Sequence, residues 1–174
     1  MEIRILQPSD DRSAFRSGDV DLDRFLQRYA GQNQFRHHLG STYVAVDQGR
    51  ILGYATVAPG QLEIDDLPGS LRKKLPAYPL PILRLARLAV DEAARGQGLG
   101  KELLRFVLQL AIRLARDYGC TGVLVDAKAE AEAFYEKLGF VPLEVIEGQS
   151  DARPAPTPMF LSVWEIQAAA RRPL

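Results

Sequence analysis

The sequence has few of the side chains from which disulfide frameworks and metal centres are built. Its 174 residues include one cysteine, Cys120, which excludes a disulfide framework and a cysteine-based zinc site. The two histidines, His37 and His38, are adjacent, so we expect no metal site and interpret both as surface residues of a loop. Cys120 has no histidine near it in the sequence, and we interpret it as a structural thiol rather than a nucleophile.

Long apolar runs are also missing. The segment 1–12 is charged and lacks the apolar stretch of a secretory signal. No run approaches the roughly 18 apolar residues that read as a membrane helix. These features predict a soluble, cytoplasmic protein of a reducing compartment with no membrane partner.

The chain has no net charge, because 22 basic residues balance 22 acidic ones. This balance excludes a global attraction to nucleic acid or membrane, but the charges are segregated along the chain. Residues 71–116 carry an excess of seven positive charges, and residues 117–165 carry an excess of six negative ones. The basic segment is suited to a phosphorylated ligand, and the alternative is that its charges are the solvated faces of helices.

The composition, with 47% hydrophobic and 25% charged residues, is that of a globular protein. The length predicts a single domain over residues 1–174, with a frayed tail from residue 167. Apolar spacing predicts a helix over residues 20–30, with Asp19 or Asp21 as its N-cap.

The pattern predicts α/β architecture with a mixed sheet. The first half contains a short edge strand and a hairpin, and its pairing is therefore antiparallel in part. In the second half strands and helices alternate, which favours some parallel pairing. The predicted strands span 3–6, 41–46, 51–58, 82–90, 123–126, 140–146 and 159–164; the predicted helices of the second half span 99–118 and 129–137, the latter ending at Gly139. Residues 59–81 are predicted to be a long connection with one short helix.

A glycine-rich loop joins the strand over 82–90 to the long helix. It contains Arg95, Gly96, Gly98 and Gly100, and Lys101 follows in the first helical turn. Glycines let backbone N–H groups crowd toward one point, and a helix N-terminus adds unpaired donors and partial positive charge. The loop therefore predicts a diphosphate site, and the alternative is a tight strand-to-helix turn.

Two common phosphate-binding motifs do not fit this loop. A Walker loop needs a hydroxyl residue after its lysine, and Glu102 stands there. A dinucleotide-binding loop needs Gly-x-Gly-x-x-Gly close to the first strand, whereas this loop has another spacing and follows roughly the fourth strand.

The sequence resembles the GCN5-related N-acetyltransferases, abbreviated GNAT, over roughly residues 41–146. The resemblance lies in the strand end Leu88–Val90, the loop from Arg95 to Gly100, and the segment Phe134–Phe140. Residues 15–18, 22–26, 87–91 and 159–161 resemble one branch, the acetyltransferase toxins of toxin–antitoxin modules. The resemblance implies the GNAT fold, with a central, mixed and twisted β-sheet flanked by helices.

By this resemblance the chain binds acetyl-coenzyme A. The backbone of Leu88, Ala89 and Val90 would pair with the pantetheine arm as an added strand does. The loop would hold the diphosphate through main-chain N–H groups; it comprises Arg95, Gly96, Gln97, Gly98, Leu99, Gly100 and Lys101. One departure is Lys128, which stands where many members have an asparagine six residues before the Phe-Tyr pair.

The resemblance assigns Tyr135 as the general acid that protonates the departing thiolate. A tyrosine of pKa about 10 carries its proton at pH 7 and can transfer it to a stronger base. The alternative is a core tyrosine that packs the short helix against the sheet. No general base stands out, with Glu63 and Asp65 as weak candidates. An α-amine has a pKa of about 7.7–8.0, so a neutral fraction exists at pH 7 and favours an α-amino acceptor.

The toxin branch implies acetylation of the α-amine of aminoacyl-tRNA, which blocks translation. Candidate RNA contacts are Arg72, Lys73, Lys74, Arg84 and Arg87, although Arg87 has the alternative of pairing with an acid such as Asp91. The other functions considered are acetylation of a small-molecule or protein amine, and a non-catalytic acyl-coenzyme A-binding module. The branch also implies a ribbon-helix-helix antitoxin and a homodimer, for which Trp164 and Leu161 are candidate interface residues if they are not core residues.

Overall fold

The computed structural model describes residues 1–77, 79–143 and 156–172. The backbone forms two compact units. The first unit contains residues 1–58 and 85–109, and the second contains residues 59–84 and 110–174. Two strands and one helix continue from one unit into the other along the chain. The single domain that the length predicts stays a prediction.

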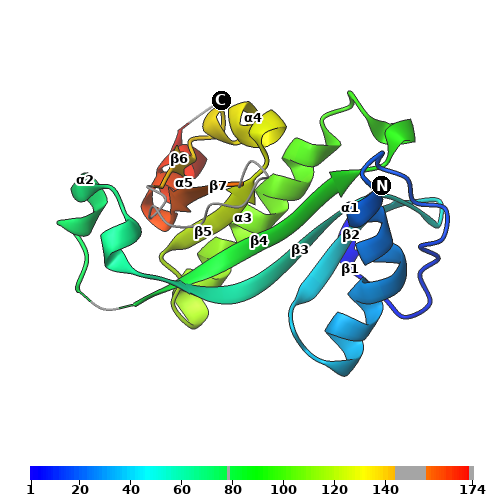
Figure 1. The fold of residues 1–174 in the computed structure, drawn as a ribbon, viewed down its shortest axis with the longest axis horizontal. Coiled ribbons are helices and arrows are strands. Elements are labelled where there is room, and N and C mark those ends of the chain that lie inside the picture. Colours follow the sequence, from blue (N-terminus) through cyan, green and yellow to red (C-terminus); the bar gives the residue numbers. More distant parts are fainter. Residues whose placement is uncertain (78, 144–155, 173–174) are drawn as a thin grey trace. The chain divides into compact units, whose positions relative to one another are not determined.

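The described strands form one sheet with the order β1-β2-β3-β4-β5-β7-β6. Their bounds are β1 Glu2–Ile5, β2 Ser41–Asp47, β3 Arg50–Leu62, β4 Leu80–Val90, β5 Gly122–Ala127, β6 Val141–Pro142 and β7 Thr157–Ser162. The pairs β1/β2, β2/β3, β5/β7 and β6/β7 are antiparallel. β4 and β5 are neighbours in this order, and a helix connects them along the chain (Figure 1). The predicted α/β chain with a mixed sheet is confirmed, including the edge strand and the hairpin.

Five α-helices are described, with short turns of other helical types between them. Their bounds are α1 Val20–Arg24, α2 Gly69–Arg72, α3 Leu99–Asp117, α4 Glu132–Glu136 and α5 Val163–Arg171. Two π-helical turns, Phe25–Tyr29 and Gln32–Arg36, follow α1, and 3-10 turns span Ile64–Asp66, Glu92–Ala94 and Ala129–Ala131. None of the helices in the described part of the chain has the length and apolar character needed to cross a membrane.

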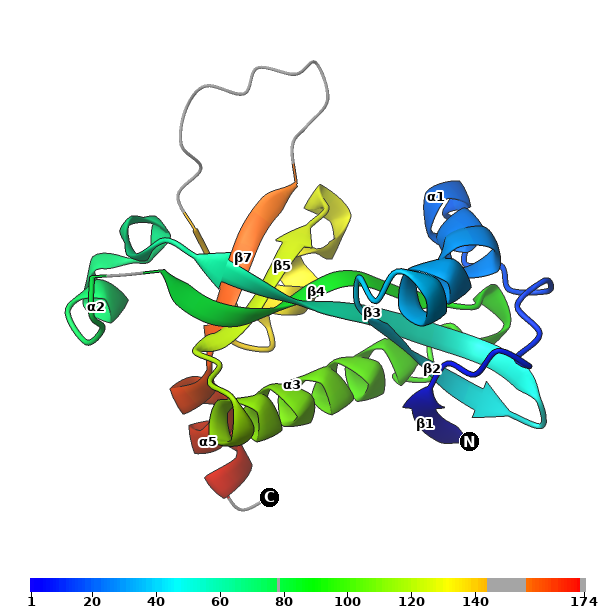
Figure 2. The same cartoon turned by 90° about the horizontal axis from the view of Figure 1, so that it is seen from below.

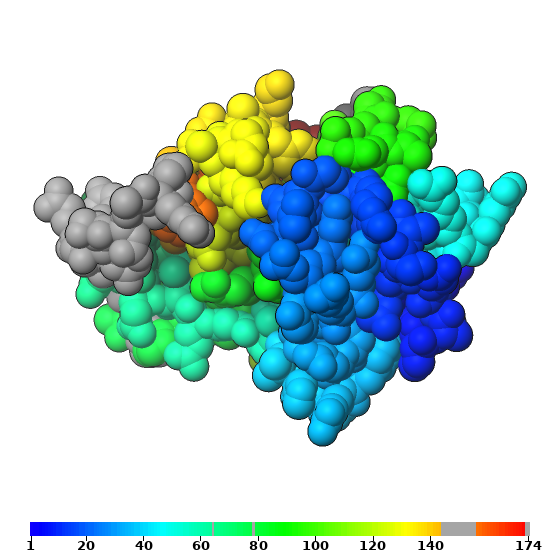
Figure 3. Space-filling model, turned by 45° about the vertical axis from the view of Figure 1, so that its right-hand side comes forward, coloured from blue at the N-terminus to red at the C-terminus, as the bar shows by residue number. Residues whose placement is uncertain are grey.

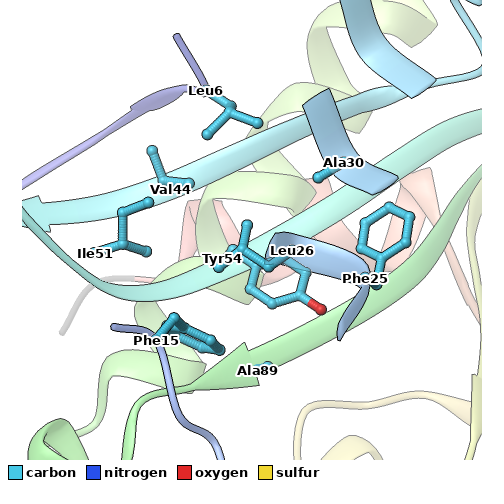
Figure 4. Close-up of a cluster of buried hydrophobic side chains, with 9 residues drawn as sticks. All are labelled: Leu6, Phe15, Phe25, Leu26, Ala30, Val44, Ile51, Tyr54 and Ala89. Carbon is cyan, nitrogen blue, oxygen red and sulfur yellow. The ribbon is translucent and has the colours of Figure 1, made fainter. Parts of the chain in front are cut away.

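In the first unit, helices cover both faces of the strands (Figure 2). Ala89 packs in a cluster with Phe25, Leu26 and Tyr54, on the α1 side (Figure 4). Its neighbours Leu88 and Val90 pack instead in a cluster that contains Leu99 and Leu103 of α3; that cluster and its neighbours comprise Ile3, Ala45, Leu52, Leu88, Val90, Ala94, Leu99 and Leu103. Successive residues of a strand point to opposite faces, so the apolar run of β4 serves both layers.

The start of α1 follows its sequence signal. The Asp19 carboxylate accepts hydrogen bonds from the N–H groups of Asp21 and Leu22 at 3.0 and 3.1 Å. Asp19 is therefore the N-cap, as one of the two predicted alternatives had it. Farther along, the Tyr54 hydroxyl donates to the Leu22 carbonyl at 2.7 Å, and this bond ties the helical segment to β3.

The prediction for residues 59–81 was wrong in its first part. β3 continues through Pro59 and Gly60 to Leu62, which is buried in the core of the second unit. The other buried members of that core are Leu67, Leu80, Ile82, Leu124, Leu143 and Phe160. Proline and glycine lower strand propensity, but burial of Leu62 outweighs that preference here.

The C-terminal prediction was also wrong. β7 ends at Ser162, and Val163–Arg171 form helix α5 where a strand to residue 164 and a frayed tail were expected. The Ser162 hydroxyl accepts a hydrogen bond from the N–H of Glu165 at 3.2 Å, which is an N-cap. Residues 173–174, and residues 144–146 of the predicted strand 140–146, lie outside the described part of the chain. The helix predicted over residues 99–118 ends at Asp117, and Tyr118 after it is 88% exposed.

Ser162→Ala is expected to lower the free energy of unfolding by about 1 kcal/mol, because it removes the N-cap of α5. Urea denaturation followed by circular dichroism measures this change. Ser9→Ala, at an exposed turn, is the matched control and is expected to leave stability unchanged. Equal stability of the two variants would contradict the capping role of Ser162.

Candidate functional site

The glycine-rich loop lies between the end of β4 and the start of α3, entirely within the first unit. Gly96 and Gly98 have φ angles of 76° and 78°, a region that side chains with a Cβ rarely adopt. A Cβ built on either glycine meets no atom within 4 Å. The side of each glycine on which a Cβ would lie is therefore open space.

Backbone donors of α3 face the same loop. The first α-helical hydrogen bond runs from the N–H of Glu102 to the carbonyl of Gly98 at 3.1 Å. The N–H groups of Leu99, Gly100 and Lys101 precede it and have no acceptor within the helix. α3 has 19 residues, so its macrodipole adds partial positive charge at this end. The loop is consequently suited to an anion such as a diphosphate.

A buried carboxylate holds the strand end from which the loop starts. The side chain of Asp91 is 3% exposed and accepts hydrogen bonds from the N–H groups of Arg16 and Ala93, at 3.0 and 2.9 Å. It also accepts one from the Arg50 guanidinium at 3.2 Å. The backbone N–H of Asp91 donates to the Leu52 carbonyl at 2.8 Å. One residue thus connects the end of β4 with the N-terminal loop and the start of β3.

The N-terminal loop also holds Arg95. The Arg95 guanidinium donates to the Ser17 carbonyl. Gly18 allows this approach, because a Cβ at that position would lie 2.7 Å from the guanidinium. A neutral carbonyl does not cancel the charge of Arg95, so the cation stays beside the glycine-rich loop. Neither the Asp91 contacts nor those of Ser17 were predicted from the sequence, because their partners lie far away along the chain.

The predicted pantetheine strand belongs to the same unit as the loop. Leu88 and Val90 are half-buried and Ala89 is buried. Their side chains pack into the two helical layers, and this packing holds the backbone of the strand end in place. The glycine-rich loop follows the strand end along the chain. The structure therefore brings all ten predicted coenzyme-binding residues, from Leu88 to Lys101, into one unit.

Tyr135 lies in the second unit, on α4. Its ring packs edge-on against Phe134 and Phe140, with centroids 5.1 and 5.4 Å away. Burial raises the pKa of Tyr135 to about 12, so the phenol keeps its proton at neutral pH. The Tyr135 hydroxyl makes no hydrogen bond within the described residues. Every fully buried polar side-chain atom of those residues has a hydrogen-bond partner, so the Tyr135 oxygen is not fully buried. The Tyr135 oxygen therefore reaches solvent, while the ring is part of the packed interior.

The five predicted RNA-contacting residues do not share one environment. Arg72, Lys73 and Lys74 are exposed at the end of α2, where Arg72 lies 4.0 Å from Asp65. Arg84 pairs with Asp126 at 3.0 Å. Arg87 lies in the first unit, and the alternative that it pairs with Asp91 was wrong. Its guanidinium instead covers the ring of Phe25, 3.7 Å from the centroid, and Asp91 pairs with Arg50.

The other residues considered in the sequence analysis are the two histidines, the two candidate bases and Cys120. His37 and His38 are exposed, and so are Glu63 and Asp65. Burial raises the pKa of the Cys120 thiol, which lowers its thiolate fraction, and the thiol donates to the Gly122 carbonyl at 3.3 Å. In the described ranges no cluster of histidine, cysteine, aspartate or glutamate side chains is suited to a metal ion.

Comparisons with known proteins agree on one family. The family model described as "Acetyltransferase (GNAT) domain" matches residues 38–142. The tRNA-acetylating toxin of Mycobacterium tuberculosis (strain ATCC 25618 / H37Rv) is 35% identical over 158 residues, which are 86% of this chain and 93% of that protein. The solved structure of AtaT complexed with acetyl-methionyl-tRNAfMet has a TM-score of 0.84 and 28% identity, covering 97% of this chain and 98% of that one. AtaTR bound with acetyl-coenzyme A has a TM-score of 0.79 and 28% identity, with 97% of both chains covered.

Gly98→Ala is expected to weaken coenzyme A binding by about tenfold or more, or about 1.4 kcal/mol, measured by isothermal titration calorimetry. The added Cβ projects into the open side of the loop, and the left-handed φ adds strain of about 1–2 kcal/mol.

Gly49→Ala is the matched control, because Gly49 has a φ of 76° and the same open surroundings in the β2–β3 turn. It is expected to lose similar stability and to retain coenzyme A affinity. Equal coenzyme A affinity of the two variants would contradict a diphosphate site at Gly98.

Proposed function

The chain belongs to the GNAT family of acetyl-coenzyme A-dependent N-acetyltransferases, and we propose that it acetylates the α-amine of aminoacyl-tRNA as a toxin that blocks translation. The observation that carries the proposal is the 35% identity to a tRNA-acetylating toxin over 93% of that toxin's length. AtaT, whose solved structure holds acetyl-methionyl-tRNAfMet, supports the same substrate class. Because aminoacyl-tRNA is used in translation, the proposed place of action is the cytoplasm.

In this proposal the glycine-rich loop binds the co-substrate, acetyl-coenzyme A. Main-chain N–H groups from Gly96 to Lys101 would bind the diphosphate of acetyl-coenzyme A, and Arg95 would add formal charge. The strand end Leu88–Val90 would pair with the pantetheine arm. The unfilled space beside Gly96 and Gly98, together with the unused donors of α3, fits such a ligand.

The chemistry requires a neutral amine, a polarised thioester carbonyl and a protonated leaving group. The new bond joins the amine nitrogen to the acetyl carbon, and the bond between that carbon and sulfur breaks. A backbone N–H such as that of Val90 would stabilise the negative charge on the carbonyl oxygen. An aminoacyl α-amine of pKa about 7.7–8.0 supplies its own neutral fraction at pH 7, so a dedicated base is not required.

Tyr135 is the proposed donor of the proton that the sulfur receives. Its raised pKa keeps the phenol protonated, and its solvent-accessible, unpartnered hydroxyl is free to bind a ligand. The amine releases one proton as it is acylated, and return of that proton through solvent restores the phenol.

Two protein partners complete the proposal: a ribbon-helix-helix antitoxin and a second copy of this chain. The relative named as a toxin supports the first. For the second, Trp164 is 49% exposed and therefore available to an interface, whereas Leu161 is a core residue. Co-expression with a neighbouring antitoxin frame, followed by pull-down, tests the antitoxin partner.

The enzyme is expected to transfer radiolabelled acetyl from acetyl-coenzyme A to charged tRNA and not to deacylated tRNA. Its tRNA affinity is expected to fall linearly with salt on logarithmic axes. Lys73→Glu with Lys74→Glu is expected to reduce that slope by about two, since each lysine that contacts a phosphate contributes about one.

The charge-matched control is Arg113→Glu with Arg116→Glu, exposed in the same unit. It is expected to keep the slope, and both double variants are expected to keep coenzyme A affinity. Transfer to free amines or proteins without transfer to charged tRNA would replace the proposed acceptor by a small-molecule or protein amine.

Tyr135→Phe is expected to lower kcat by about tenfold or more and to leave coenzyme A affinity unchanged, because only proton donation is lost. With a pKa of about 12 the phenol stays protonated up to pH 9, so the kcat profile of the unmodified enzyme is expected to show no descending limb below that pH. Phe134→Leu, on the same helix, serves as the packing control. Equal kcat in Tyr135→Phe and the unmodified enzyme would remove the general-acid role.

A further inference from the structure

A pocket of about 180 Å³ lies within the first unit, beside the strand end proposed to bind the pantetheine arm. Its walls come from the helical segment after α1 and from β2, β3 and β4. The helical segment forms part of the surface of the first unit (Figure 3, blue). The pocket lining includes Phe25, Leu39, Thr42, Thr56, Ala58 and Arg87.

Three of the polar residues that line the pocket, Gln34, Thr42 and Thr56, have hydrogen-bond partners. The hydroxyls of Thr42 and Thr56 bond to each other at 2.8 Å, and both residues are buried. The Gln34 amide donates to the Leu6 carbonyl at 3.0 Å and accepts from the Thr42 N–H at 2.7 Å. The walls beside them are apolar, with Phe25, Ala30, Leu39 and Ala58. A ligand group in this space therefore meets mostly apolar surface and satisfied dipoles, together with the amide of Asn33.

Arg87 is the charged residue of the pocket lining. It is half-buried, and its guanidinium is stacked over the Phe25 ring. In the described part of the chain no carboxylate forms an ion pair with it. Arg87 and the carboxylates Asp19 and Asp23 all act electrostatically on the buried Tyr54 hydroxyl, so Arg87 adds positive charge to the pocket lining without being isolated from acidic groups. This cation repels a second cation most strongly where water is scarce. Arg87 directly precedes Leu88, the first residue of the proposed pantetheine strand.

We propose that this pocket receives the side chain of the amino acid whose α-amine is acetylated, and that Arg87 excludes cationic side chains. The inference rests on the proposed function and deepens it by naming the acceptor class. The volume of the pocket supports one side chain rather than a larger ligand. A cavity of about 150 Å³ holds benzene, whereas drug-sized ligands need about 300–1,000 Å³. Uncharged side chains up to the size of phenylalanine are the occupants that fit.

The test compares acceptors that differ only in side chain, in two series: aminoacyl-tRNAs and the corresponding amino acid ethyl esters. Leucyl and methionyl acceptors are expected to react with a kcat/KM about tenfold or more above lysyl and arginyl acceptors, or about 1.4 kcal/mol. Arg87→Gln is expected to shrink this ratio at least about fivefold by removing the repulsion. Arg105→Gln, an exposed arginine of α3 in the same unit, is expected to keep it.

A second variant probes the apolar wall without touching the core. Leu39 is 63% exposed, so Leu39→Ala is expected to fold normally. It is expected to lower kcat/KM for leucyl acceptors and to spare glycyl acceptors, which have no side chain to place in the pocket. Val20→Ala, an equally exposed apolar residue of the first unit, is expected to affect neither.

The two series separate this inference from the function on which it rests. If the esters show the selectivity and charged tRNA is not acetylated, the pocket assignment stands and the tRNA substrate falls. If charged tRNA is acetylated while Arg87→Gln leaves the lysyl-to-leucyl ratio unchanged, the Arg87 role is overturned. If Leu39→Ala slows glycyl and leucyl acceptors equally, the pocket does not hold the side chain.

Discussion

The carboxylate of Asp91 is the point on which the geometry of the first unit depends. A buried carboxylate without partners would be costly, and the N–H groups of Arg16 and Ala93 with the Arg50 guanidinium remove that cost. These bonds fix the end of β4, and the glycine-rich loop begins there. The same N-terminal loop that Asp91 holds supplies the carbonyl that orients Arg95. Strand end, loop and N-terminal segment therefore form one interdependent structure rather than three adjacent ones.

Those parts of the fold that depend on local pattern were predictable from the sequence. β4 and the long helix α3 have strong apolar periodicity, and the loop between them has glycines where positive φ angles occur. Helix α5 was missed although Ser162 and Glu165 have the spacing of a capping box, because the apolar run 159–164 was interpreted as one continuous strand. β3 was predicted too short because Pro59 and Gly60 suggested a break, and burial of Leu62 decided otherwise.

The candidate site was predictable only where its residues are consecutive. Residues 88–101 were identified from one segment, and the structure places them in one unit. The Arg50–Asp91 pair joins positions 41 residues apart, and no local spacing reveals such a pair. Arg87 illustrates the same limit: its charge suggested an acidic or phosphate partner, whereas its neighbour is the ring of Phe25 from a different element. Tertiary packing, and not composition, determines what such a side chain contacts.

The two π-helical turns after α1 carry an evolutionary implication. Each closes with a bond from residue i+5 to residue i, as from Ala30 to Phe25 and from His37 to Gln32, and so each accommodates one more residue than an α-helical turn. An α-helix rotates about 100° per residue, so losing a single codon within residues 25–36 would swing every later side chain of the segment around the axis. Phe25, Asn33 and Gln34 belong to this stretch and line the cavity beneath it. Insertion or deletion of a single residue in this segment would therefore change which side chains line the pocket during evolution. The strands of the sheet would keep their sequence.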